Sequence, residues 1–347
     1  FLLLFTVLGV LASGALFWLA QGQWGMALAV YLFGLLGFSG SNIFYDALLV
    51  DVAAAAEYER VSAFGYALGY LGGGLLFALN VVMTLRPEAF GFPGPAEAVQ
   101  AAFLSVAVWW ALFTLPVAIW VPGGEGSGRR TFGAALSGAL AELAGVLGEV
   151  RRYRATFLFL LAYWFYIDGV DTIVRMAVDY GLAIGFPADS LMVALLVTQF
   201  VGFPAALVFG RLGERWGTKR SILLAIGIYM LVILGAAGMD RVEEFYALAV
   251  AIGLVQGGIQ ALSRALFAGL VPAGRTAEYF GFFNMVGKFA AVLGPGLVAI
   301  AAALTGDSRL SLLPIMLLFL IGALLLWRVD VAQGRAAASA PRNGDVA

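Results

Sequence analysis

The sequence predicts an all-helical integral membrane protein, from its composition and from ten long apolar segments. Of the 347 residues, 62% are hydrophobic and 12% are charged, against roughly 45–50% and roughly 25% in soluble domains. A soluble protein of this size would have to expose large apolar patches, which promote aggregation. The composition therefore excludes a soluble enzyme, a nucleic-acid-binding protein and a disordered chain.

Each of the ten segments has about 20 mostly apolar residues, enough for a helix to cross a bilayer. Because their hydrophobicity is continuous rather than alternating, the strands of a membrane β-barrel are excluded. The ten segments are residues 1–20, 26–50, 62–85, 100–121, 155–180, 190–210, 221–239, 245–270, 279–304 and 308–328.

Two of the connecting segments are long. Residues 86–99 are rich in Pro and Gly and predict an irregular loop on the outer side. Residues 122–154 begin with Pro and several Gly and continue as a basic, amphipathic stretch, which predicts a flexible hinge and a surface helix. The chain thus divides into four helices over 1–121, a cytoplasmic linker over 122–154, six helices over 155–330 and a cytoplasmic tail over 331–347.

The distribution of Lys and Arg predicts the orientation. If the 122–154 linker is cytoplasmic and the helices alternate in direction, 14 of the 20 Lys and Arg residues fall on the cytoplasmic side and three fall outside. Loops that stay in the cytoplasm carry such an excess of positive charge. We therefore expect a multi-pass protein of the bacterial cytoplasmic membrane, with both termini of the full protein in the cytoplasm.

Cys and His are both absent from the chain. Without them there is no disulfide, no thiolate nucleophile and no Cys/His zinc site. The sequence also lacks a nucleophile elbow, a zincin helix and a P-loop. We expect no enzyme activity, no metal and no cofactor, so any proton chemistry falls on carboxylates, Lys or Tyr.

One loop motif identifies the architecture. After the sixth segment comes Gly-Arg-Leu-Gly-Glu-Arg-Trp-Gly-Thr-Lys-Arg, which resembles the loop signature of the major facilitator superfamily. Its predicted gating-loop residues are Gly210, Glu214, Arg215, Gly217, Lys219 and Arg220. The resemblance implies a fold of two pseudo-symmetric six-helix bundles in which this loop follows helix 8. The chain would then hold helices 3–12, ten of the twelve, with helices 1 and 2 upstream of Phe1.

A narrower resemblance, to the vacuole-effluxer family of that superfamily, covers most of the chain outside 86–154 and the tail. It rests on Tyr45–Leu49, Glu59–Gly74, Asp168–Met176, Gly257–Phe267 and Glu278–Lys288. It implies a transporter similar to the autophagy-related permeases, whose fungal members export amino acids from the vacuole. Two segments also carry a face of small residues, Gly65, Gly69 and Gly73 in one and Gly202, Ala206 and Gly210 in the other. The superfamily resemblance implies that these faces pack together as helices 5 and 8, although unrelated helix packing would also use such faces.

Four charged residues lie in the segment 155–180, where burial costs several kcal/mol and so suggests a function. Asp171, Arg175 and Asp179 are spaced four apart, which predicts a structural ion ladder on one helix face. Asp168 lies about 20 Å from the start of the helix at Arg154. It either couples transport to protons or binds an ammonium group, or it forms a salt bridge with Arg175 or Lys288.

Lys288 and Asn284 lie one turn apart in the segment 279–304. A lysine this deep needs a carboxylate or an anionic substrate. Asp168 and Lys288 are therefore candidates for holding the two ends of a zwitterion.

The remaining polar residues have two interpretations each. The resemblance implies that Arg264 pairs with Glu214 as a gating bridge and that Asp46 is its counterpart in the first half. Asn42, Tyr45, Gln256 and Gln260 are candidates for lining the substrate cavity, although such residues commonly form helix–helix hydrogen bonds.

We expect a secondary transporter of a small polar solute, with amino acids the first candidate and protons the first candidate for coupling. It would work as a monomer in the bilayer, by alternating access, without nucleic acid. Two alternatives remain open. One is a multidrug-type exporter of the same fold, and the other is a membrane receptor that no longer transports.

Overall fold

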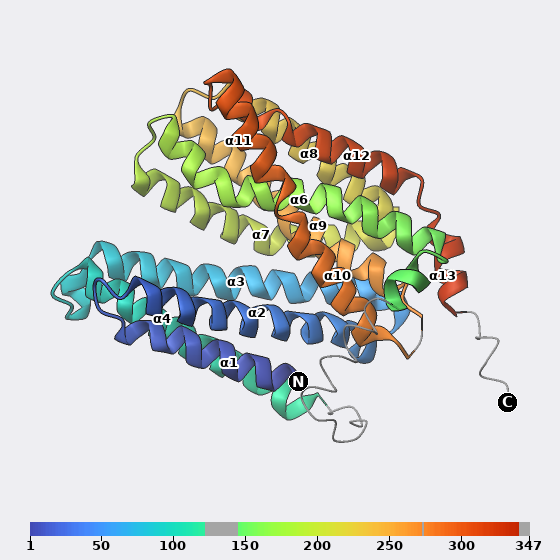
Figure 1. The fold of residues 1–347 in the computed structure, drawn as a ribbon, viewed down its shortest axis with the longest axis horizontal. Coiled ribbons are helices and arrows are strands. Elements are labelled where there is room, and N and C mark those ends of the chain that lie inside the picture. The colour runs from blue at the N-terminus through green and yellow to red at the C-terminus, as the bar shows by residue number, and fades with distance from the viewer. Residues whose placement is uncertain (122–144, 273, 340–347) are drawn as a thin grey trace. The chain divides into compact units, whose positions relative to one another are not determined.

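The computed structural model describes residues 1–121, 145–272 and 274–339 (Figure 1). Within these ranges, nine helices are long and apolar enough to cross a membrane, and Leu2–Trp18 is a shorter apolar helix. The prediction of an all-helical membrane protein is confirmed. The main helices are α1 (Leu2–Ala15), α2 (Trp24–Val52), α3 (Tyr58–Leu85), α4 (Pro95–Trp120), α6 (Arg154–Ala183), α7 (Ala188–Trp216), α8 (Thr218–Ala237), α9 (Val242–Ala268), α10 (Thr276–Ala290), α11 (Leu293–Thr305), α12 (Ile315–Trp327) and α13 (Val331–Ser339).

The ninth predicted segment is one membrane span made of two helices. α10 ends at Ala290 and α11 begins at Leu293, with Ala291 and Val292 between them. Pro295 explains the break, because proline has no N–H and its ring clashes with the carbonyl four residues earlier, here that of Ala291. In the first turn of α11, the same proline is tolerated.

The predicted irregular loop at 86–99 is shorter than expected. A 3₁₀ turn (η3) covers Pro87–Phe90, and α4 begins already at Pro95. Pro95 lies in the first turn, where proline is pre-organised for a helix, and Glu97 in that turn complements the helix dipole. In the predicted tail, Val331–Ser339 forms the short helix α13. Residues 122–144 of the predicted linker lie outside the described residues.

The described chain forms two compact units, Phe1–Leu48 with Gly72–Gly138 and Leu49–Leu71 with Ala139–Ala347. In the first unit, α1 packs along α4. Gly9 and Gly37 let α1 and α2 approach, because a β-carbon at Gly37 would lie 2.4 Å from the Gly9 nitrogen. The limits 1–121, 122–154, 155–330 and 331–347 stay a prediction, although the structure groups residues 49–71 with the later helices.

In the second unit, α7 packs along α9, α6 packs on α12, and α10 packs on α6 (Figure 1). Glycines permit the closest of these contacts. A β-carbon at Gly258 on α9 would lie 2.2 Å from the Phe209 ring on α7, and one at Gly253 would lie 2.9 Å from the Thr198 carbonyl oxygen. Two membrane helices associate closely where small residues face each other.

The beginning of α3 packs on α7, but through a different face from the predicted one. Gly210 lies against Ala63, and Gly202 lies against the ring of Tyr70. A β-carbon at Gly69 would meet no atom within 4 Å. Gly202 and Gly210 on α7 therefore make the predicted contact with α3. The α3 residues that meet them are Ala63 and Tyr70, which lie outside the predicted small-residue stripe.

Candidate functional site

The break between α10 and α11 is closed by a carboxylate from α6. Asp168 is fully buried, and its two oxygens accept hydrogen bonds from the backbone N–H of Gly294 at 3.0 and 3.1 Å. Asp168 is the fifteenth residue of α6, so it lies near the middle of that 30-residue helix. A carboxylate at a helix N-terminus satisfies donors that have no partner within the helix and complements the helix dipole.

The contact between α6 and α11 depends on a glycine. The hydroxyl of Thr172, one turn after Asp168, donates to Asp168 Oδ1 at 3.4 Å. A β-carbon at Gly294 would lie 1.9 Å from Thr172 Oγ1 and 2.9 Å from Asp168 Oδ1. Only a residue without a side chain brings this N–H to the carboxylate.

Further charges gather near this break. Arg175 and Asp171 form an ion pair at 3.8 Å, and Lys288 on α10 also acts electrostatically on the Asp171 carboxylate. Asp179, the last residue of the predicted ladder, is exposed. Two carboxylates and two cations from α6 and α10 thus lie around one discontinuity within the membrane span. Such broken helices are where transporters commonly bind substrates and ions.

Tyr229 on α8 is a member of this region that the sequence interpretation missed. Its ring stacks on Phe319 with centroids 5.3 Å apart, and its hydroxyl is buried without a hydrogen-bond partner in the described part of the chain. Asp171 and Tyr70 are within electrostatic reach of that hydroxyl. A buried hydroxyl without a partner is costly, so it is a candidate donor to a bound solute.

The other predicted cavity residues are dispersed. Asn284 on α10 donates to the Phe280 carbonyl at 3.1 Å, within its own helix. Gln256 and Gln260 are half-buried on α9. Asn42, Tyr45 and Asp46 belong to the first unit. Their roles stay predictions.

A second polar cluster joins the beginning of α3 to the α7–α8 turn. Glu59 is buried, and its Oε1 accepts hydrogen bonds from Thr218 Oγ1 at 2.6 Å and from Arg335 of α13 at 3.1 Å. Gly217 begins the turn with a φ of 93°, in the left-handed region that favours glycine. The predicted gating loop is thus bound by Glu59, while Glu214 and Arg215 are exposed.

Arg264 on α9 is buried beside this cluster. Its guanidinium donates to the hydroxyl of Ser62 at 2.9 Å and to the Ser62 carbonyl at 3.2 Å, and it lies over the ring of Tyr66 at 4.8 Å. The Ser62 hydroxyl in turn donates to the Ala261 carbonyl at 2.7 Å. These contacts join α3 to α9, and the predicted bridge from Arg264 to Glu214 stays a prediction.

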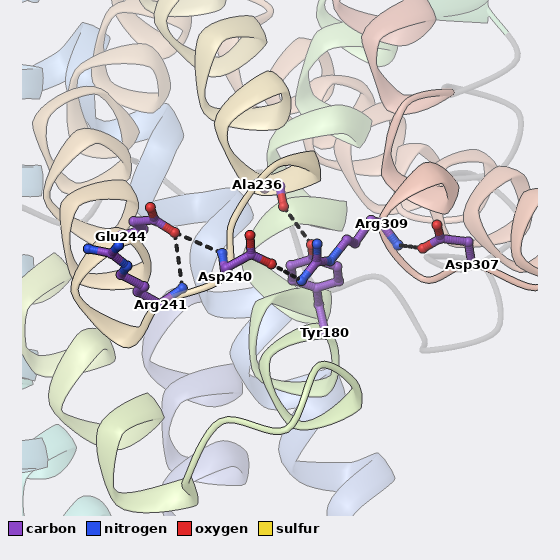
Figure 2. A network of polar contacts seen from close by, with 7 residues as sticks. All are labelled: Tyr180, Ala236, Asp240, Arg241, Glu244, Asp307 and Arg309. Carbon is purple, nitrogen blue, oxygen red and sulfur yellow. Dashed lines mark hydrogen bonds and ion pairs between the residues drawn. The ribbon is translucent and has the colours of Figure 1, made fainter.

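At the other end of the second unit, a polar network joins the helix connections (Figure 2). Arg309 donates to Asp240 at 2.6 Å, which links the α11–α12 connection to the α8–α9 connection and raises the pKa of the guanidinium. Tyr180 of α6 donates to the Ala236 carbonyl at 2.6 Å, and Glu244 accepts from the backbone N–H groups of Asp240 and Arg241. These contacts order the end of the unit that the charge distribution predicts to be outside.

Comparison with known sequences gives one family. Residues 50–339 match the model for "Vacuole effluxer Atg22 like" proteins. The chain is 39% identical over 323 residues to an uncharacterized MFS-type transporter, YxiO of Bacillus subtilis, covering 93% of this chain and 75% of that protein. It is 28% identical over 297 residues to Autophagy-related protein 22 of Cryptococcus neoformans, covering 80% of this chain and 51% of the fungal protein. The chain thus spans about half the length of the fungal relatives.

Comparison with solved structures gives the fold. The crystal structure of the major facilitator superfamily transporter FucP in the outward conformation matches with a TM-score of 0.67 at 14% identity, covering 95% of this chain and 82% of FucP. The human organic anion transporter MFSD10 matches with a TM-score of 0.66 at 16% identity, covering 94% and 76%. At these identities, the likeness shows the fold alone.

Proposed function

Because the chain belongs to the Atg22-like vacuole effluxers of the major facilitator superfamily, we propose that it is a secondary transporter that carries a small zwitterionic solute, an amino acid in the first instance. The chain is a multi-pass membrane protein of a transporter family. The substrate, the coupling ion, the monomeric state, the bacterial cytoplasmic membrane and the cytoplasmic termini are part of the proposal.

The observation that carries this proposal is the charged discontinuity between α10 and α11. A zwitterion needs one anionic and one cationic partner within the membrane, and each buried charge needs compensation. Asp168 and Asp171 supply carboxylates, while Lys288 and Arg175 supply cations. An amino acid would place its ammonium group toward the carboxylates of α6 and its carboxylate toward Lys288.

Asp168 also gives the proposal a coupling step. As a carboxylate it accepts from the Gly294 N–H with both oxygens. A proton on one oxygen removes the negative charge that strengthens these hydrogen bonds. Protonation would therefore loosen α11 from α6. The charged group that acts on Asp168 in this step is Asp171, which in turn interacts with Arg175 and Lys288. Alternating access in this fold rocks two halves around a site near the membrane midplane.

The test is counterflow in proteoliposomes that contain the purified protein at its full length. Vesicles loaded with unlabelled amino acids are diluted into a labelled mixture with no ion gradient, so that exchange is detected whatever the coupling ion. Accumulation of label would support the amino-acid proposal. No accumulation by folded protein would contradict it and favour the multidrug-type exporter or the receptor, which dye efflux and ligand binding then separate.

Proton coupling has its own test in the same vesicles. Asp168→Asn keeps an oxygen that accepts from Gly294 but cannot take up and release a proton. We expect this variant to keep part of the counterflow, because Asp171 still supplies a carboxylate for the ammonium group, and to lose uptake driven by an imposed pH gradient. Gradient-driven uptake at the wild-type rate would show that Asp168 is not the coupling group.

A further inference from the structure

A polar pocket lies at the predicted cytoplasmic end of the second unit, apart from the site at the helix break. It has a volume of about 750 Å³ and is formed by the beginning of α3, the α7–α8 turn and the α12–α13 connection. This volume falls within the range of roughly 300–1,000 Å³ that ligand pockets show.

The carboxylates of this pocket are mostly occupied by the protein itself. Glu59 accepts from Thr218 and Arg335. Asp330 accepts from the backbone N–H of Gln333 at 3.0 Å, at the beginning of α13. The charge of Glu59 is offset by Arg335, and the charge of Asp330 acts on Lys219.

The cations are not all occupied. Lys219 donates to the carbonyls of Trp327 and Val329 at 2.6 and 2.8 Å, at the end of α12. Arg220 and Arg328 line the pocket, are exposed, and have no hydrogen-bond or ion-pair partner within residues 1–121, 145–272 and 274–339. The remaining acidic group, Glu214, is a single exposed carboxylate. Two arginines are thus available to an anion from outside the protein.

Two tryptophans place the pocket at the membrane surface. Trp216 ends α7 and is 60% exposed, and Trp327 ends α12 and is 72% exposed. Tryptophan is enriched where the hydrocarbon meets the headgroups of a bilayer. Both residues line the pocket, so we expect its opening to lie at headgroup level.

We propose that this pocket binds the phosphate headgroup of an anionic phospholipid from the leaflet on the predicted cytoplasmic side. Arg220 and Arg328 would bind the phosphate, since a guanidinium matches phosphate oxygens with two parallel hydrogen bonds. The two tryptophans would lie along the glycerol and the upper acyl chains. Basic pockets between membrane helices on this side recognise anionic headgroups in this way.

The proposal predicts selective lipid binding by the purified full-length protein. Native mass spectrometry during titration with phosphatidylglycerol and with phosphatidylcholine measures the two affinities. Phosphatidylcholine also carries a phosphate, but its choline group makes the lipid neutral, so two cations at the membrane surface should favour phosphatidylglycerol by about 10- to 30-fold. We expect Arg220→Gln/Arg328→Gln to lose this preference and to keep the wild-type melting temperature. Each single variant should lose part of it, which keeps the test available if the double variant does not fold.

The matched control is Arg86→Gln/Arg211→Gln, which removes the same charge from two exposed arginines outside the pocket. We expect it to keep the lipid preference. Equal affinity for the two lipids in the wild-type protein would overturn the proposal, as would equal losses in the two double variants. Inorganic phosphate that binds alone and displaces phosphatidylglycerol at millimolar concentration would assign the pocket to a soluble phosphate compound instead of a lipid.

Discussion

The carboxylate of Asp168 stabilises the broken membrane span, and removing it should destabilise the protein measurably. Asp168→Ala leaves the Gly294 N–H without its acceptor in a fully buried position. A hydrogen bond to a charged group contributes about 1.5–3 kcal/mol. Since each kcal/mol shifts the melting temperature of a large domain by about 2–4 °C, we expect a decrease of about 3–12 °C.

Asp168→Asn separates the acceptor from the charge. Asn and Asp are about equally favoured as N-cap residues of helices, because the side-chain oxygen of either accepts a hydrogen bond from the first backbone N–H groups. Because the negative charge strengthens these hydrogen bonds, we expect this variant to melt below the wild type but above Asp168→Ala. The assay is thermal unfolding of the full-length protein in one detergent, followed by intrinsic tryptophan fluorescence.

Asp179→Ala is the control, since it removes an exposed carboxylate from the same helix. Surface substitutions of this kind stay within about 0.5 kcal/mol. Wild-type stability of Asp168→Ala would refute the reasoning that this carboxylate holds α11. A loss in Asp168→Asn as large as that in Asp168→Ala would show that the charge, and not the acceptor oxygen, stabilises the break.

Three further substitutions test the packing around the two polar clusters. Gly294→Ala should lower the free energy of unfolding by about 1–3 kcal/mol, because its β-carbon would lie 1.9 Å from Thr172 Oγ1. Adding Thr172→Ala should restore part of the melting temperature in thermal unfolding. An unchanged melting temperature in the single variant would contradict the close approach. Ser62→Ala should lower the free energy of unfolding by about 1–3 kcal/mol, since it removes the acceptor of Arg264 and the donor to the Ala261 carbonyl. The same melting experiment checks it, and Ser105→Ala, at a half-buried position, should lower the melting temperature less. Gly217→Ala should lower the free energy of unfolding by about 1–2 kcal/mol, because a residue with a side chain is strained at the φ of 93° found here. If limited proteolysis cleaves the α7–α8 turn no faster than in the wild type, this strain is absent.

The membrane helices were predictable because hydrocarbon imposes one rule on all of them. Every backbone polar group must be satisfied within the segment, so long apolar runs become helices. The segment 221–239, for example, corresponds to α8 at Thr218–Ala237. The break in 279–304 was missed because its apolar run is continuous. The signal was present in Leu293-Gly-Pro-Gly, since Gly and Pro interruptions in a membrane segment often mark a binding site.

The site was predictable only where function follows from a single residue. A carboxylate in the middle of a membrane segment is rare and indicates a function, so Asp168 was a candidate from the sequence alone. Its partner was not predictable, because Gly294 contributes a backbone N–H 126 residues away and leaves no trace in charge or hydropathy. Glu59 was missed for a similar reason. It precedes the predicted segment 62–85, and its partners Thr218 and Arg335 are 159 and 276 residues distant.

The central claim is that the charged break between α10 and α11 binds the solute, and counterflow with variants of its charges tests this most directly. The measurement compares amino-acid exchange in proteoliposomes of the wild type and of Asp168→Asn/Lys288→Met, with Glu88→Gln in the exposed α3–α4 connection as the control. We expect the control to exchange at the wild-type rate and the double variant to lose at least about tenfold, the effect of about 1.4 kcal/mol of binding. Exchange by the folded double variant at the wild-type rate and affinity would show that the solute binds elsewhere.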